Sequence, residues 1–127
     1  MTLPTSTQHR IMTTLSVNTA LIEERLQQLI AALIKQYDEY SRRNYGRPSD
    51  TNYLSFEIVK GTKYYKLIMK QGTGTSVHAF ISRQTGAMYK PASWRAPAKH
   101  VRYNLLDDTS FAECLRRADW AGGYLYL

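Results

Sequence analysis

Cysteine is nearly absent from this sequence of 127 residues, because Cys114 is the only one. A lone cysteine excludes an intramolecular disulfide and a zinc site built from several thiolates. The histidines His9, His78 and His100 are not spaced as metal ligands, and no glycine run is followed by the lysine and helix of a phosphate-binding loop. We therefore expect no metal, no cofactor and no catalytic activity.

Long apolar runs are also missing, so the sequence predicts no membrane-spanning segment. The first 14 residues lack the apolar core of a signal peptide, and a cytoplasmic protein is the expectation. The length and the hydrophobic content of 43% are typical of a single globular domain with its own core.

Acidic residues are absent from the stretch between Ile58 and Leu106, although the stretch contains nine lysines and arginines. It therefore carries a charge of +9, and the rest of the chain carries −2, which accounts for the net charge of +7. A charge this unevenly distributed indicates a polyanionic partner.

The most informative stretch is the basic segment 88–106, in which aromatic residues alternate with cations. Pro91 and Pro97 fix the backbone and remove two donors, which predicts an irregular loop over residues 91–106. Phosphates bind to such cations, and flat bases stack on such rings. In the alternative interpretation, the loop packs Trp94 on the sheet and its cations are simply solvated. The candidate ligand-binding residues are Tyr89, Lys90, Trp94, Arg95, Lys99, His100, Arg102, Tyr103 and Asn104.

Residues 18–45 show the clearest periodicity, an apolar stripe at alternating steps of three and four residues. Ile22, Leu26, Leu29 and Leu33 form its centre, and Gly46 predicts its end. The stripe predicts a long helix that packs on the sheet and assembles a homo-oligomer. Residues 1–17 show no periodicity and are expected to be a flexible arm.

Residues 53–90 predict an antiparallel meander, because short alternating segments are separated by glycine-bearing turns. One face of this sheet, with Val77, Ala79 and Ile81, is aliphatic and is expected to pack on the helix. The second face is expected to be an aromatic and basic platform, which the loop or a second subunit would alternatively cover. Its members would be Tyr64 and the candidate ligand-binding residues Lys66, Lys70, His78 and Phe80.

A short helix is predicted at residues 109–118, with Thr109 as its cap, and a final strand at residues 124–127. The predicted fold is therefore α+β: one long N-terminal helix packed on four or five antiparallel strands, a basic aromatic loop and a short C-terminal helix. Residues 18–127 would form one domain.

The C-terminal half resembles a recurring signature of small tailed-phage proteins that have no settled activity. The resemblance implies a phage origin, and hence the cytoplasm of an infected bacterium. The matching blocks are residues 77–80 (VHAF), 85–86 (TG), 89–90 (YK), 92–94 (ASW), 96–99 (APAK), Arg102, Asn104 and 124–126 (YLY).

The leading functional hypothesis is non-catalytic binding of a nucleotide-containing polyanion, with single-stranded nucleic acid as the first candidate. Lys90, Arg95, Lys99 and Arg102 would bind phosphates, while Trp94 and its neighbouring tyrosines would stack on bases. A different class is an oligomeric sponge that sequesters a host immune-signal nucleotide. Two further classes are a protein inhibitor of a host enzyme and a minor virion component.

Overall fold

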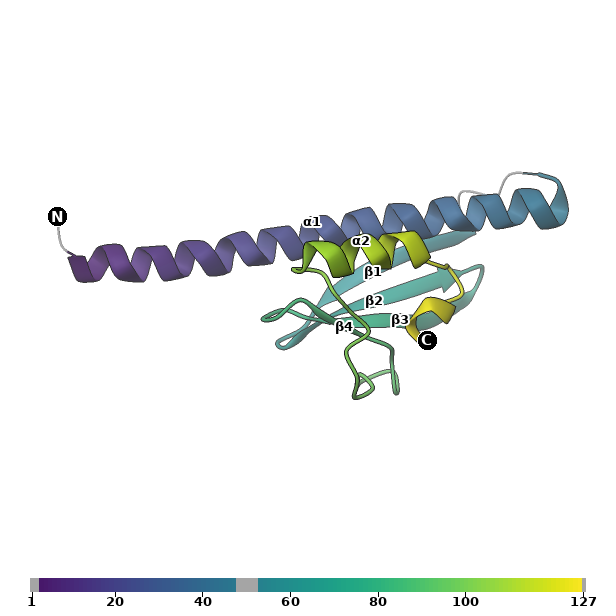
Figure 1. Cartoon of the computed structure of the whole chain (residues 1–127). Helices are drawn as coiled ribbons and strands as arrows, with labels where there is room; N and C mark the ends of the chain where they lie inside the picture. The colour runs from purple at the N-terminus through teal and green to yellow at the C-terminus, as the bar shows by residue number, and fades with distance from the viewer. Residues whose placement is uncertain (1–2, 48–52, 127) are drawn as a thin grey trace.

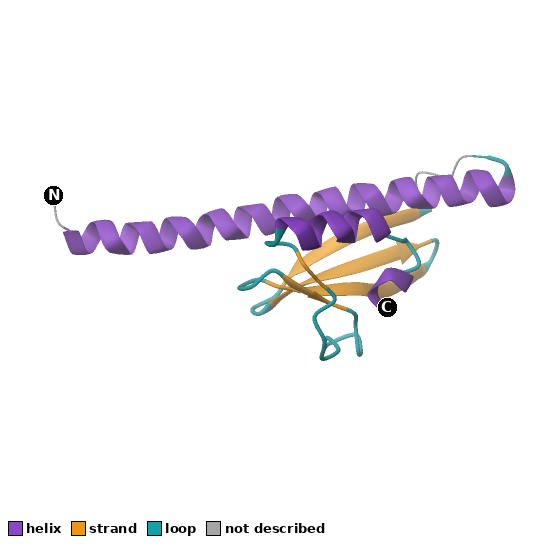
Figure 2. Ribbon diagram, in the orientation of Figure 1, coloured by secondary structure: helices purple, strands orange, loops and turns teal. Residues whose placement is uncertain are grey.

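The computed structural model describes residues 3–47 and 53–126 and confirms the α+β prediction (Figure 2). A long N-terminal helix lies across one face of a five-stranded antiparallel sheet, and a short helix lies beside it on the same face (Figure 1). The elements are α1 (Leu3–Tyr45), β1 (Leu54–Lys60), β2 (Tyr64–Gln71), β3 (Gly74–Ser82), β4 (Ala87–Tyr89), β5 (Tyr103–Asn104), α2 (Asp108–Arg117) and the 3₁₀ helix η1 (Gly123–Tyr126).

Helix α1 begins at Leu3, so the expectation that residues 1–17 form an arm outside the helix is wrong from Leu3 onward. Its 43 residues give a length of about 65 Å. An apolar periodicity is expected only where a helix packs on another element. The N-terminal half of α1 extends past the sheet (Figure 1), so the sequence showed no such pattern there. The helical stretch has no glycine, and Pro4 lies in the first turn, where proline is tolerated. At the other end Gly46, with φ of 70°, donates its N–H to the carbonyl oxygen of Arg42 at 3.0 Å and ends the helix.

The core lies between α1 and the sheet. Ile22, Leu26, Leu29 and Leu33 are all fully buried in one cluster with strand residues such as Leu67. The centre of the apolar stripe therefore packs on the chain's own sheet and is not available to a second copy. Assembly through α1 stays a prediction, and it would have to use surface outside these four residues.

The strands follow one another in the order β1-β2-β3-β4-β5, each antiparallel to the next. Residues 53–90 form the meander as predicted, but Tyr103 and Asn104 pair with β4 as a fifth strand. The sequence placed them in the irregular loop because two residues are too few to show alternation. The final strand predicted at 124–127 is also wrong for residues 124–126, since Gly123–Tyr126 is a 3₁₀ helix, and residue 127 lies outside the described residues.

A β-bulge in β3 changes which residues point to which face. The pairing steps from Leu67 opposite Ala79 to Ile68 opposite Val77, so His78 is the extra residue. Val77 consequently lies on the face away from α1, and His78 turns inward toward Tyr124. The expectation that Val77 shares the helix-facing side, with His78 on the other, is wrong for this reason.

Helix α2 begins one residue earlier than predicted. Asp107, rather than Thr109, is the N-cap, and its carboxylate accepts a hydrogen bond from the N–H of Ser110 at 3.1 Å. Phe111 and Cys114 of α2 enter the core beside α1. Among the described residues, no helix is both long and apolar enough to cross a membrane.

Candidate functional site

The loop after β4 crosses the side of the sheet opposite α1 (Figure 1) and is fixed by its own backbone. Pro91 and Pro97 face one another as an isolated β-bridge. The N–H of Ala92 donates to the carbonyl oxygen of Ala96, and that of Ala98 donates to Lys90, each at 2.9 Å. The tip around residues 93–96 is therefore a small closed hairpin, and it presents Trp94 in a defined position.

Trp94 completes a cluster that we call the aromatic–cationic face, made of Tyr64, Lys66, Phe80, Tyr89 and Trp94. The ammonium of Lys66 lies 4.9 Å from the ring centroid of Trp94 and 5.7 Å from that of Phe80. Tyr64 meets Phe80 and Tyr89 edge to face, at 5.9 Å and 6.2 Å. These contacts orient the rings and the cation without a neighbouring carboxylate from the same segment.

A hollow of about 320 Å³ lies beside Trp94, between β3 and the loop. Val77 and Pro91 give it apolar walls, and Ser93 adds a hydroxyl. Trp94 remains 49% exposed beside it. The volume is at the lower end of the range for small-ligand sites, about 300–1,000 Å³. Apolar walls beside an exposed indole suit a flat ring.

The cations of the basic stretch differ in their exposure and in the contacts they make. Arg95, Lys99 and His100 are exposed, whereas Arg102 is half-buried and its backbone N–H donates to Met88 at 2.7 Å. Lys70 forms an ion pair with Glu57 at 3.7 Å, which offsets its charge. The exposed cations on the loop are therefore the ones best placed to meet an anion.

Sequence reasoning missed a second exposed ring beside a cation. The ammonium of Lys90 lies 4.5 Å from the ring centroid of Tyr126, which is 59% exposed. No local pattern indicated this pair, because the two residues are distant in the sequence and only the fold of η1 brings them together. An exposed tyrosine and a lysine in contact extend the cationic and aromatic surface toward the C-terminal end of the chain.

Three of the expected ligand residues are buried. Phe80 is 2% exposed beneath Lys66, and Tyr103 is 8% exposed with its hydroxyl donating to the carbonyl oxygen of Tyr124 at 3.2 Å. His78 is 6% exposed because the bulge turns it inward. Phe80 therefore belongs to the aromatic–cationic face as a buried support beneath Lys66, and none of these three side chains is open for stacking. The expected open platform of stacked aromatics on the sheet is wrong. The loop covers part of that face, as the alternative interpretation held.

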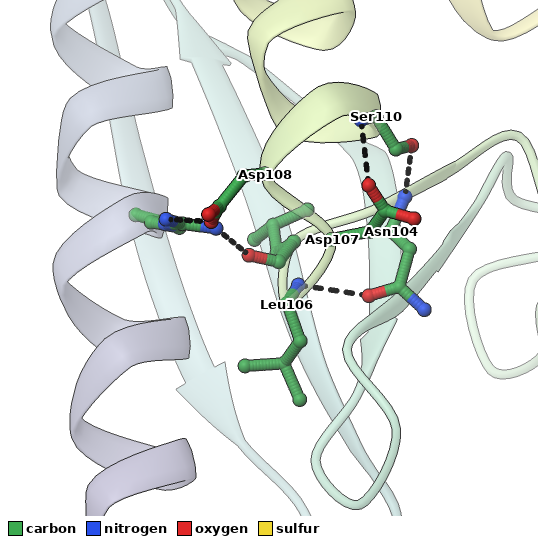
Figure 3. A network of polar contacts seen from close by, with 7 residues as sticks. Asn104, Leu106, Asp107, Asp108 and Ser110 are labelled. Carbon is green, nitrogen blue, oxygen red and sulfur yellow. Dashed lines mark hydrogen bonds and ion pairs between the residues drawn. The ribbon is translucent and has the colours of Figure 1, made fainter.

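Asn104 shapes the chain and was not recognised as a turn residue from the sequence (Figure 3). Its side-chain oxygen accepts the N–H of Leu106 at 2.8 Å, and its own N–H donates to the hydroxyl of Ser110 at 2.8 Å. The expected ligand-binding role of Asn104 therefore competes with these structural hydrogen bonds. The signal was present, because asparagine commonly closes turns of this kind.

The buried His78 and Cys114 each contact a neighbouring side chain in the core. The Nε2 atom of His78 lies 2.8 Å from the hydroxyl of Tyr124, and burial lowers the pKa of His78 to about 4. Burial raises the pKa of the Cys114 thiol to about 12, and this thiol contacts the sulfur of Met88 at 3.8 Å. Both groups are therefore uncharged at neutral pH. Within residues 3–47 and 53–126, no three His, Cys, Asp or Glu side chains are grouped so as to hold a metal ion.

The depressed pKa of His78 predicts a loss of stability in acid. Between its ordinary pKa of 6.5 and its folded pKa of about 4, the unfolded state binds the proton that the folded state refuses. The free energy of unfolding should therefore decrease as the pH falls through this window, by about 3 kcal/mol in total from this group. Denaturant unfolding between pH 7 and pH 4 should show a steeper decline for the native chain than for His78→Gln. His100→Gln, at an exposed site, should follow the native curve, and parallel curves for all three chains would contradict the assignment.

Comparison with known proteins places the chain in a family without assigning an activity. No curated protein and no solved structure matches the chain. One family matches residues 7–127, which includes almost all of α1, the whole sheet, the loop and both C-terminal helices. The chain therefore belongs to the family of unknown function DUF7717.

Proposed function

We propose that the protein binds single-stranded nucleic acid without catalysis, across the aromatic–cationic face and the loop. The observation that carries the proposal is the setting of Trp94: a half-exposed indole beside an apolar hollow, within a segment that has nine cations and no acid. A base would stack on Trp94 or enter the hollow. Lys90, Arg95 and Lys99 would meet the phosphates that flank it.

An extended ligand suits this surface better than a small enclosed one. Arg95 and Lys99 lie on exposed loop backbone, and Lys90 points toward Tyr126 at the end of the chain. Cations spread along a path can each neutralise one phosphate of a strand, whereas a sponge for a small nucleotide would need them to converge. The resemblance to tailed-phage proteins would place this binding in an infected bacterial cell.

The salt dependence of binding tests the role of the charges. Fluorescence anisotropy with a labelled single-stranded 20-mer, as DNA and as RNA, would be recorded between 50 and 300 mM salt. Each phosphate contact on a single strand contributes about −0.7 to the slope of log affinity against log salt. Lys99→Gln should flatten the slope by about that amount. Lys35→Gln, which removes an exposed cation from α1 on the other side of the sheet, is the matched control and should leave the slope unchanged.

Trp94→Ala tests the stacking separately. Loss of base stacking should weaken binding by about 1–3 kcal/mol with little change in slope. Because Trp94 is 49% exposed, the thermal midpoint should change little. Native affinity in both Trp94→Ala and Lys99→Gln, with the fold intact by circular dichroism, would exclude this surface as the site.

A further inference from the structure

A second cleft, with a volume of about 520 Å³, lies where the β1–β2 and β3–β4 turns approach α1. Its walls contribute two cations, Lys63 and Arg83, and no carboxylate. Hydroxyl and amide groups surround them, and two tyrosines form one side. The remaining lining residues are Thr19, Thr62, Tyr64, Ser82, Gln84, Thr85 and Tyr89.

Arg83 is held in place before any ligand arrives. Its Nη1 donates to the carbonyl oxygens of Gly61 at 2.6 Å and Thr62 at 3.4 Å, and its guanidinium lies 5.8 Å from the ring centroid of Tyr65. The backbone N–H of Arg83 also donates to Lys63 at 2.9 Å. These bonds join the two turns through Nη1 of the guanidinium, which also interacts with the hydroxyl of Tyr65. The guanidinium has five N–H donors in a rigid fork, so donors remain for a bidentate anion.

Glu23 of α1 interacts electrostatically with Arg83, but it is already engaged by other partners. Glu23 accepts a hydrogen bond from the hydroxyl of Tyr65 at 2.6 Å and forms an ion pair with Lys60 at 3.2 Å. These two bonds, with a smaller contribution from Arg83, lower the pKa of Glu23. Glu23 is thus satisfied mainly by partners other than Lys63 and Arg83. The positive charge inside the cleft is left for an external anion.

The cleft is continuous with the proposed binding surface, because Tyr64 and Tyr89 belong to both. A nucleic-acid strand that crosses the aromatic–cationic face toward these tyrosines reaches the cleft next, which Thr19 of α1 also lines. We propose that the cleft binds the terminal phosphate monoester of the bound strand. A monoester carries a charge of about −1.5 to −2 at neutral pH. Two cations that line one cleft match this charge better than they match the single charge of an internal phosphodiester. The inference rests on the proposed function and adds a preference for phosphorylated ends.

The test compares three single-stranded 20-mers of one sequence: with hydroxyls at both ends, with a 5′-phosphate, and with a 3′-phosphate. The full-length chain should bind at least one phosphorylated strand about tenfold more tightly than the unmodified strand, as expected for charge-assisted hydrogen bonds. Lys63→Gln should abolish this ratio and leave the affinity for the unmodified strand nearly unchanged, because Lys63 is exposed and its backbone bond to Arg83 remains. Arg83→Lys keeps the charge but loses the fork, and it should reduce the ratio.

Lys99→Gln is the matched control, because it removes an exposed cation from the loop and not from the cleft. It should weaken all three strands by the same factor and keep the ratio. Equal affinities of the native chain for all three strands would overturn this inference while the proposed function stands, as would a ratio that survives in Lys63→Gln. If none of the strands binds, the proposed function itself fails and the inference fails with it.

Discussion

Replacing Leu29 with alanine is expected to lower the free energy of unfolding by about 2–5 kcal/mol. Leu29 is fully buried at the centre of the contact between α1 and the sheet. The substitution removes buried methyl groups and leaves a cavity that the sheet can only partly close. Denaturant unfolding should show a lower midpoint with an unchanged slope. Ile34→Ala is the control on the same helix, because Ile34 is 40% exposed and its truncation should cost less than about 1 kcal/mol.

The concentration dependence of this loss separates two roles of the stripe. If Leu29 packs only on its own sheet, the loss should be the same at every protein concentration. If the stripe instead joins two copies, stability would increase with protein concentration, since association adds to the folded state. A loss that disappears at high concentration would therefore contradict the packing seen here.

Replacing Gly86 with alanine is expected to destabilise the fold by about 2–4 kcal/mol. Gly86 has φ of 79°, a conformation that side chains other than glycine rarely adopt. An added Cβ would lie 2.8 Å from the Cγ of Leu106 and 2.9 Å from the side-chain oxygen of Asn104. The backbone carbonyl of Gly86 also accepts the N–H of Leu105 at 2.8 Å, so displacement of the turn would break a bond to the chain beyond β5.

Gly46→Ala separates the two sources of this cost. Gly46 has a similar φ of 70°, but its added Cβ would meet no atom within 4 Å. Both variants have the unfavourable backbone conformation, and only Gly86→Ala has the collision. Thermal or denaturant unfolding should show a clearly larger loss for Gly86→Ala, and equal losses would mean that Asn104 and Leu106 yield without cost.

The sequence correctly predicted the elements that have a periodic pattern of apolar residues, because such a pattern indicates packing of one face within the chain. The stripe from Ile22 to Leu33 and the alternation in β2 both follow from burial on one face, so both were readable. The N-terminal half of α1 was not predicted, because a helical segment that does not pack on the sheet requires no apolar stripe. The bulge at His78 was hidden because Val77 is apolar although it lies on the outer face. Val77, Ala79 and Ile81 therefore look like a regular alternation in the sequence.

The candidate site was only partly predictable. The cations and aromatic rings were visible in the sequence, but only those that are exposed in the fold can contact a ligand. Tyr103 is buried because it pairs with β4 as part of the sheet. The contact of Lys66 with Trp94 joins β2 to the loop, and the contact of Lys90 with Tyr126 joins the loop to η1. Such contacts depend on where the loop folds back, which no local pattern specifies.

Helix α1 packs on the sheet along only part of its length, and this determines where the helix unfolds first. Residues from Ile22 to Leu33 cannot unwind without exposing the core, so their amide hydrogens exchange with solvent only when the whole domain unfolds. The N-terminal turns, which extend past the sheet, are stabilised chiefly by their own hydrogen bonds and by propagation from the anchored part (Figure 1). The helix therefore unfolds first at its N-terminal end. The part that packs on the sheet stays helical and is the nucleus from which the N-terminal end refolds.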